Sequence, residues 1–287
     1  MGLERASWRI YHGNGIIRSI AIMALVFSCI TPHTPLLIPT VAKDRLVAIE
    51  KTRQAMLTLE QDLYVSQPET ILVITPHGES LPDALTIDMH SSFIGNFEEF
   101  GDLVTQITWK PDTLLIDRFR EDFKEKQLPL VLGSWQKLDY GSAVPLYYLT
   151  AHLPQAKIIV LNVAGFDMKT HYDLGKQLKD EIMRSTRRVA VVASADLSHR
   201  AGPEAPAGLS PKGVAFDDKI MEIIKTGNHT AILDIDEEWI AESQTCGAKV
   251  IAMVFGLMDE VRHRHDILSY EKPFGVGYMV AVGRLVF

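Results

Sequence analysis

Three histidines of this sequence each follow a short apolar run. His33 and His77 end two copies of the tetrapeptide Ile-Thr-Pro-His, and His199 comes soon after the run that ends at Ala193. A proline has no amide hydrogen and fixes φ near about −65°, so it stops a strand and presents the next side chain on a stiff turn. Metal ligands need such stiffness, because coordination tolerates only small errors in distance. The pattern therefore predicts a metal site.

A purely structural explanation of the same pattern is that Thr-Pro-His ends a strand and the imidazole is hydrogen-bonded at the surface. It suits a single histidine, but two copies of the tetrapeptide and a third strand-end histidine favour a shared site. The other histidines fall in expected helices, loops or the tail, where ordinary structural roles suit them. They are His12, His90, His152, His171, His229, His263 and His265.

Two imidazoles do not complete a metal site. Non-haem Fe(II) oxygenases add one carboxylate and leave positions open for substrate and O2. The carboxylate candidates are Glu79, Asp196 and Glu242. Cys246 stands four residues after Glu242, so these two would share a face if the segment is helical. Each also has a structural alternative: a solvated helix carboxylate for Glu242 and a small buried apolar group for Cys246.

The rest of the chain predicts the frame that holds these residues. Apolar runs rich in β-branched residues alternate with amphipathic stretches, which is typical of βαβ units with a parallel sheet. Strands are expected at 24–30, 70–74, 130–132, 157–163, 188–193 and 275–287, and an antiparallel or edge ribbon at 83–90 and 103–109. Helices are expected at 43–64, 112–126, 143–152, 168–185, 212–226 and 248–259.

We therefore predict a single α/β domain with a mostly parallel central sheet flanked by helices. In open sheets of this kind, ligands bind beyond the carboxyl ends of the strands. Because all three histidines follow strands, the metal site is expected at that edge of the sheet.

Composition narrows the function classes. The chain has 287 residues, of which 47% are hydrophobic and 23% charged, and its formal net charge is −7. An acidic chain without a basic tract is a poor nucleic-acid binder. Two cysteines are too few for a disulfide framework and favour a reducing, cytoplasmic location.

The N-terminal region contains an apolar stretch that is interrupted by Arg18 and is shorter than the ~20 residues of a membrane span. No membrane association is expected. Residues 1–22 are predicted to be a poorly ordered N-terminal extension, and residues 23–287 to form the domain.

Several segments, taken together and in order, resemble one family. They are Thr31-Pro-His-Thr-Pro, Thr75-Pro-His-Gly, Leu138-Asp-Tyr-Gly, Ser194-Ala-Asp-Leu-Ser-His, Ser210-Pro-Lys-Gly with Phe216-Asp217, Cys246-Gly247, and Gly275-Val-Gly-Tyr-Met. The chain is similar to class III extradiol ring-cleavage dioxygenases of the LigB type, and especially to the branch related to Memo proteins.

The resemblance implies a function and a site. It implies Fe(II) in a cleft at the strand ends, with a small aromatic catechol and O2 as substrates, and association as a homodimer. His33 and His77 match the family's histidine ligands. His199 matches its second-sphere histidine, with Asp196 beside it in the Asp-Leu-Ser-His segment.

Two positions depart from the dioxygenase pattern. Where many relatives carry Asp-His-Gly, this chain has Tyr140, a phenol that can donate a hydrogen bond but does not titrate near neutral pH. The third ligand is glutamate in the dioxygenases and cysteine in Memo-like relatives. Family position favours Cys246, whereas iron chemistry favours Glu242, because a thiolate prefers Zn²⁺ or copper.

Three functions remain open at this point. The leading prediction is an Fe(II)-dependent extradiol dioxygenase. The alternative is a Memo-like metal-binding redox or accessory protein without ring-cleaving activity. The third is a zinc hydrolase that uses the same histidines with Asp196 as its base.

Overall fold

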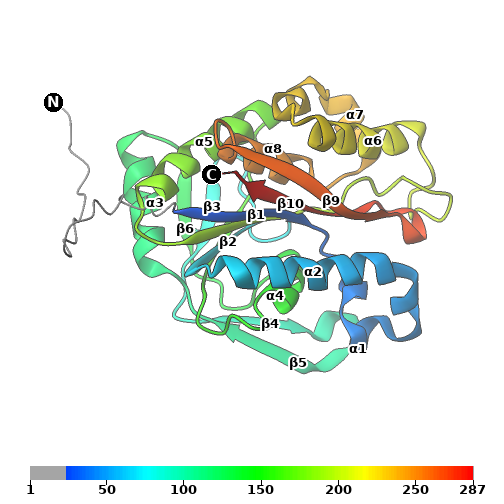
Figure 1. The fold of residues 1–287 in the computed structure, drawn as a ribbon, viewed down its shortest axis with the longest axis horizontal. Coiled ribbons are helices and arrows are strands. Elements are labelled where there is room, and N and C mark those ends of the chain that lie inside the picture. Colours follow the sequence, from blue (N-terminus) through cyan, green and yellow to red (C-terminus); the bar gives the residue numbers. More distant parts are fainter. Residues whose placement is uncertain (1–23, 287) are drawn as a thin grey trace, which may run out of the picture.

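The structure is a computed structural model that describes residues 24–286. An eight-stranded sheet runs through this part of the chain (Figure 1). The expectation for residues 1–22 lies outside the described residues. The strand order is β6-β3-β7-β2-β8-β1-β10-β9. The strands are β1 (Leu25–Thr31), β2 (Thr70–Thr75), β3 (Leu85–Asp88), β6 (Leu130–Gly133), β7 (Lys157–Asn162), β8 (Val189–Ser194), β9 (His263–Glu271) and β10 (Tyr278–Leu285).

Strands β7, β2, β8 and β1 run parallel to one another in the middle of this sheet. Every residue of β2 and β8 is buried. Strand β2 is rich in isoleucine and threonine and β8 in valine, and these β-branched side chains suit a sheet that is covered on both faces. The prediction of a mostly parallel α/β sheet is confirmed.

Helices cover both faces of the sheet (Figure 1). One face packs against α3, α5, α6 and α8, and the other against α2 and α4, which gives two separate hydrophobic cores. The α-helices are α1 (Pro39–Ala42), α2 (Glu50–Ser66), α3 (Thr113–Glu125), α4 (Tyr140–Leu149), α5 (Met168–Arg184), α6 (Pro211–Thr226), α7 (Glu237–Ser243) and α8 (Ala248–Leu257). The 3-10 helices are η1 (Pro35–Leu37), η2 (Lys43–Ile49), η3 (Glu98–Phe100), η4 (His229–Asp234) and η5 (Pro273–Gly275).

Side-chain caps mark the start of several helices. Asp112, Asp139 and Asp167 accept hydrogen bonds from the first-turn amides of α3, α4 and α5. Ser210 caps α6, whose first residue is Pro211, a residue that needs no amide partner there. All six helices expected from periodicity are present, and these four of them have a side-chain cap; the segment expected as one helix at 43–64 is divided into η2 and α2.

Some expectations about the sheet are wrong. Both segments expected in an antiparallel or edge ribbon do pair antiparallel, but with different partners: β3 joins the main sheet beside β7, and β5 (Asp102–Trp109) forms a separate two-stranded ribbon with β4 (Phe93–Phe97). Strand β6 is an edge strand and partly exposed rather than buried on both faces. Strand β9 and helix α7 were not expected, because both are polar and carry no clear apolar period.

Within residues 24–286, no helix combines the length and apolar character required to traverse a bilayer.

Candidate metal centre

Three neighbouring parallel strands end at one edge of the sheet. In their registers Thr31 of β1 lies opposite Ser194 of β8, and Ile74 of β2 lies opposite Ala193. His33 and His77 therefore leave the sheet at the same edge, on either side of β8, each two residues beyond its strand. The local chain explains this placement, since Thr-Pro ends each ladder and turns the histidine over the rim.

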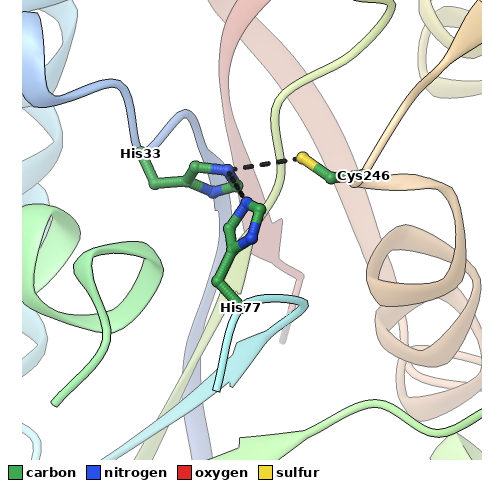
Figure 2. A group of neighbouring side chains, drawn as sticks. All are labelled: His33, His77 and Cys246. Carbon is green, nitrogen blue, oxygen red and sulfur yellow. Dashed lines mark hydrogen bonds between the residues drawn. The ribbon is translucent and has the colours of Figure 1, made fainter. Parts of the chain in front are cut away.

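The structure brings His33, His77 and Cys246 together (Figure 2). The Nε2 atoms of His33 and His77 are 3.0 Å apart, and Sγ of Cys246 is 3.4 Å from Nε2 of His33. One ligand atom of each residue lies within 4.8 Å of the other two. Ligands that each bind one ion at ~2.0–2.3 Å are separated by about 3–3.5 Å, so these donor atoms fit around a single ion.

The hydrogen bonds of His33 determine which of its two ring nitrogens carries a free lone pair. Ser194 Oγ donates its hydrogen to the carbonyl of Gly141. It therefore accepts from Nδ1 of His33, which lies 2.9 Å away. Nε2 of His33 is left with its lone pair facing the other two donor atoms, which is the orientation that a metal ligand needs.

Burial keeps both imidazoles neutral. His33 is 1% exposed, and loss of solvation lowers its pKa to about 3. Burial and the neighbouring His33 ring lower the pKa of His77 to about 4. Neutral imidazole is the form that binds metal ions, so both rings are ready to coordinate at neutral pH.

Cys246 reaches the histidines because a glycine follows it. The amide of Gly247 donates to the carbonyl of Asp196 over 3.1 Å, and a Cβ atom at Gly247 would lie 2.6 Å from that oxygen. The Cys-Gly pair therefore packs directly on the loop after β8. Burial raises the pKa of the Cys246 thiol, so a metal ion must displace its proton before a thiolate bond forms.

Glu242 lies outside this cluster. Its carboxylate accepts a hydrogen bond from Ser210 Oγ at 2.7 Å and pairs with Lys212 Nζ at 3.3 Å. Helix α7 ends at Ser243, and Gln244 adopts a left-handed conformation with φ 51°. The expectation that Glu242 and Cys246 share a helical face is wrong, because the helix ends between them.

Tyr140 stands at the first residue of α4, beside His77. The two rings stack with centroids 4.6 Å apart. Asp139 fixes this helix start, since its Oδ1 accepts from the amide of Ser142 at 3.0 Å and from Thr75 Oγ1 at 2.8 Å. A Cβ atom on Gly141 would lie 2.6 Å from Thr75 Oγ1, which explains the glycine of the Asp-Tyr-Gly segment.

Asp196 and His199 approach the cluster from the loop after β8. Oδ1 of Asp196 accepts from the backbone amide of His33 at 2.9 Å, and its Oδ2 lies 3.6 Å from Nε2 of that ring. Burial raises the pKa of Asp196 to about 6. Nε2 of His199 lies 3.9 Å from Sγ of Cys246, and burial lowers the pKa of this imidazole. The neutral imidazole of His199 therefore lies next to the proposed metal-binding atoms, where it can act as a base.

Two residues that position the site could not be given a role from the sequence. Ser194 orients His33 through the hydrogen bond to its Nδ1. Asp217 accepts from the amide of Ser198 at 2.8 Å and from the hydroxyl of Tyr270 at 2.7 Å, which holds the loop that carries His199. Both lie in motifs that the resemblance singled out, but their partners are distant in the chain and could not be deduced from spacing.

Comparison with known sequences identifies the family of the chain. The sequence model of a family described as “Catalytic LigB subunit of aromatic ring-opening dioxygenase” matches residues 28–281. The match covers most of the chain, so the chain belongs to this family, as its ordered motifs indicated.

The individual relatives share low sequence identity with this chain. Protein CA_C1420 of Clostridium acetobutylicum is 27% identical over 258 residues, which make up 87% of this chain but only 55% of that protein. The 4,5-DOPA dioxygenase extradiol of Mirabilis jalapa is 22% identical over 186 residues, which make up 62% of this chain and 67% of that protein.

A solved structure has a similar fold. The crystal structure of the uncharacterized protein JW3007 from Escherichia coli K12 superposes with a TM-score of 0.62 at 15% identity, and covers 90% of this chain and 99% of that one. At this level of identity the likeness concerns the fold alone.

Proposed function

We propose that this chain is a non-haem Fe(II)-dependent extradiol dioxygenase that opens the ring of a catechol-like aromatic with O2. The observation that carries the proposal is the convergence of His33, His77 and Cys246 beside Tyr140 and His199. Membership of the LigB family supports the same reaction class.

The donor set fits a metal ion, with His33, His77 and Cys246 as the proposed ligands. When bound, such an ion brings a catechol and O2 together and stabilises the charge that develops on their oxygens. Non-haem Fe(II) oxygenases leave positions open for substrates on an ion held by three protein ligands. His77 and Cys246 are both partly exposed, which would allow substrates to approach an ion held there.

The remaining residues have proposed roles in proton transfer and orientation. His199 is neutral, so its imidazole can take the proton of a catechol hydroxyl and later return it. Tyr140 is protonated and donates a hydrogen bond on the ligand side of His77. Phe100 of η3 packs edge-on against Tyr140, with ring centroids 5.5 Å apart, and offers an apolar wall for an aryl ring.

The second candidate is a Memo-like metal-binding redox or accessory protein that does not cleave rings. Cys246 favours it, because its Sγ occupies the position of the third donor and thiolate prefers Zn²⁺ or copper to Fe(II). Tyr140 favours it as well, because a phenol is a weaker acid–base group near neutral pH than the histidine that many relatives carry.

Oxygen uptake separates the two candidates. Protein loaded anaerobically with Fe(II) is mixed with a panel of catechols and then exposed to air. A yellow ring-opened product with matching O2 consumption supports the dioxygenase. If no member of the panel gives product or uptake, the dioxygenase proposal fails.

Metal analysis completes the comparison. Copper or zinc in protein purified without added metal, with a spectrum that depends on Cys246, supports the accessory protein. Ester or amide hydrolysis that continues without O2 would instead support the zinc hydrolase with Asp196 as its base. The homodimer and the cytoplasmic location stay predictions.

A further inference from the structure

A second group of histidines lies apart from His33 and His77. His263 and His265 begin the edge strand β9, and their alternation puts both side chains on the face that packs against α6 and α8. His229 begins η4, the short helix after α6. The three residues each offer one nitrogen, and these nitrogens lie within 4.8 Å of one another. The sequence alone predicts ordinary structural roles for all three, because they fall in expected helices, loops or the tail.

The hydrogen bond of His263 fixes which of its ring nitrogens carries a lone pair. Nδ1 of His263 donates to the carbonyl of Val261 at 2.6 Å, so its Nε2 carries a lone pair. That Nε2 atom is buried, and no described residue bonds to it. Nδ1 of His265 lies 3.0 Å from Nε2 of His229, a separation that suits two ligands of one ion as well as it suits a hydrogen bond.

Packing holds the three rings in place. His229 stacks on Phe255 of α8 with centroids 4.4 Å apart, and lies nearly parallel to His263 at 4.9 Å. His265 is 8% exposed and meets both of the other imidazoles edge-on. Such fixed rings lose little freedom when an ion binds.

The imidazoles are also in the protonation state that ligands need. Burial lowers the pKa of His229 to about 4, and it lowers the pKa of His263 as well. Burial and the two neighbouring rings hold the pKa of His265 well below its ordinary value. At neutral pH a metal ion therefore meets three neutral rings and displaces no proton from a cationic one.

We infer that His229, His263 and His265 form a second metal site, which binds a divalent ion such as Zn²⁺, Ni²⁺ or Cu²⁺ through three imidazole nitrogens. Imidazole selects these ions, whereas Mg²⁺ and Ca²⁺ require oxygen ligands. No carboxylate belongs to this group among the described residues. A bound ion would join η4 to strand β9, the outermost strand of the sheet.

The inference does not rest on the proposed dioxygenase activity, and its test removes the first centre. A His77→Ala, Cys246→Ala variant is stripped of metal and titrated with Zn²⁺ in equilibrium dialysis. We expect one equivalent to bind, and adding His229→Ala with His263→Ala should weaken that binding by about 100-fold or more, beyond the loss typical of outer-shell changes. Co²⁺ bound to the first variant should give ligand-field bands without a thiolate charge-transfer band.

A matched control is available on the same strand. Arg264 is exposed and lies between the two histidines, so Arg264→Ala in the same background should leave Zn²⁺ binding unchanged. If the first variant binds no Zn²⁺, or if binding survives loss of His229 and His263, the inference is overturned.

A second measurement keeps the cluster intact, in case its substitution impairs folding. Crystals of the His77→Ala, Cys246→Ala variant grown with Zn²⁺ are measured at the zinc absorption edge. An anomalous peak between the three imidazoles supports the site. Crystals without a peak there overturn it.

Discussion

The hydroxyl oxygen of Tyr140 lies 3.1 Å from Nε2 of His77, the same nitrogen that faces His33. Burial raises the pKa of Tyr140 to about 12, so the phenol is protonated throughout the neutral range and can donate a hydrogen bond. A fixed donor therefore lies beside the proposed ligand atoms. If Nε2 of His77 binds a metal, its lone pair is occupied, and the Tyr140 hydroxyl is then free to donate to a substrate oxygen.

Replacing Tyr140 tests this role. Tyr140→Phe keeps the ring that stacks on His77 but removes the hydroxyl. We expect kcat to fall by on the order of 100-fold, the usual effect of losing one donor to developing charge, while metal content is unchanged. Tyr140→His should retain more activity than Tyr140→Phe, because an imidazole can also donate. Loss of metal in Tyr140→Phe would instead identify the phenol as a ligand.

His199 is predicted to transfer protons rather than to bind metal. His199→Gln should therefore lower kcat by about 10²- to 10⁴-fold, the range of general acid–base catalysis, with little change in metal content. O2 uptake and metal analysis on one preparation separate the two effects. His152→Gln is a suitable control, because His152 pairs with Glu60 at the surface.

Ser194 is predicted to act through His33. Ser194→Ala removes the acceptor of the Nδ1 hydrogen, so the ring can rotate or change tautomer. We expect metal affinity to fall by about 10- to 100-fold. Ser28 provides a matched control, since it is also buried in a central strand but its hydroxyl bonds to no described residue. Ser28→Ala should leave affinity unchanged, and equal losses in both variants would contradict a specific role.

The third ligand can be decided by paired substitutions. In a His229→Ala, His263→Ala background, which removes the second proposed site, Cys246→Ser should weaken Zn²⁺ binding by about 100-fold or more and should abolish any thiolate-to-metal band. Glu242→Gln should change neither, because that carboxylate is bound to Ser210 and Lys212. Competition with a colorimetric zinc chelator measures both affinities. If Glu242→Gln weakens Zn²⁺ binding and Cys246→Ser does not, Glu242 rather than Cys246 is the third ligand.

The sequence could predict the strand-end part of the centre because its signal is local. At both His33 and His77, an apolar run, a proline and the histidine follow one another closely in the sequence. Parallel strands bring their carboxyl ends to one edge of the sheet, so the two histidines meet there. Cys246 was found only through its place in the family pattern. The sequence alone leaves Glu242 as an alternative ligand, because nothing in it marks the end of α7 at Ser243.

Other features depend on contacts between distant segments. Whether Ser194 faces His33 or the opposite side depends on how β8 is packed between β1 and β2. The cluster of His229, His263 and His265 depends on strand β9, whose polar sequence reflects its edge position and gives no clear strand period. Edge strands are hard to predict because one side of their ladder is not enclosed by the sheet.

The stability of the fold should depend on pH through His171, a fully buried residue of α5. Its Nε2 accepts from the amide of Ala164 at 3.2 Å and its Nδ1 donates to the carbonyl of Asp167 at 2.8 Å, so only the neutral ring fits. Burial lowers its pKa from 6.5 to about 4. Because the folded pKa is below the unfolded one, this contribution is complete above pH 6.5 and is lost as the pH falls toward 4.

This effect can be isolated by comparison with a His171→Gln variant. Between about pH 7.5 and about pH 4.5, the wild-type protein should lose roughly 2–3 kcal/mol more unfolding free energy than the variant. Urea denaturation at several pH values measures the difference. Other buried imidazoles are common to both proteins, so their contributions cancel in this comparison. Parallel curves for the two proteins would show that His171 accepts a proton in the fold without cost, contrary to the geometry around its Nε2.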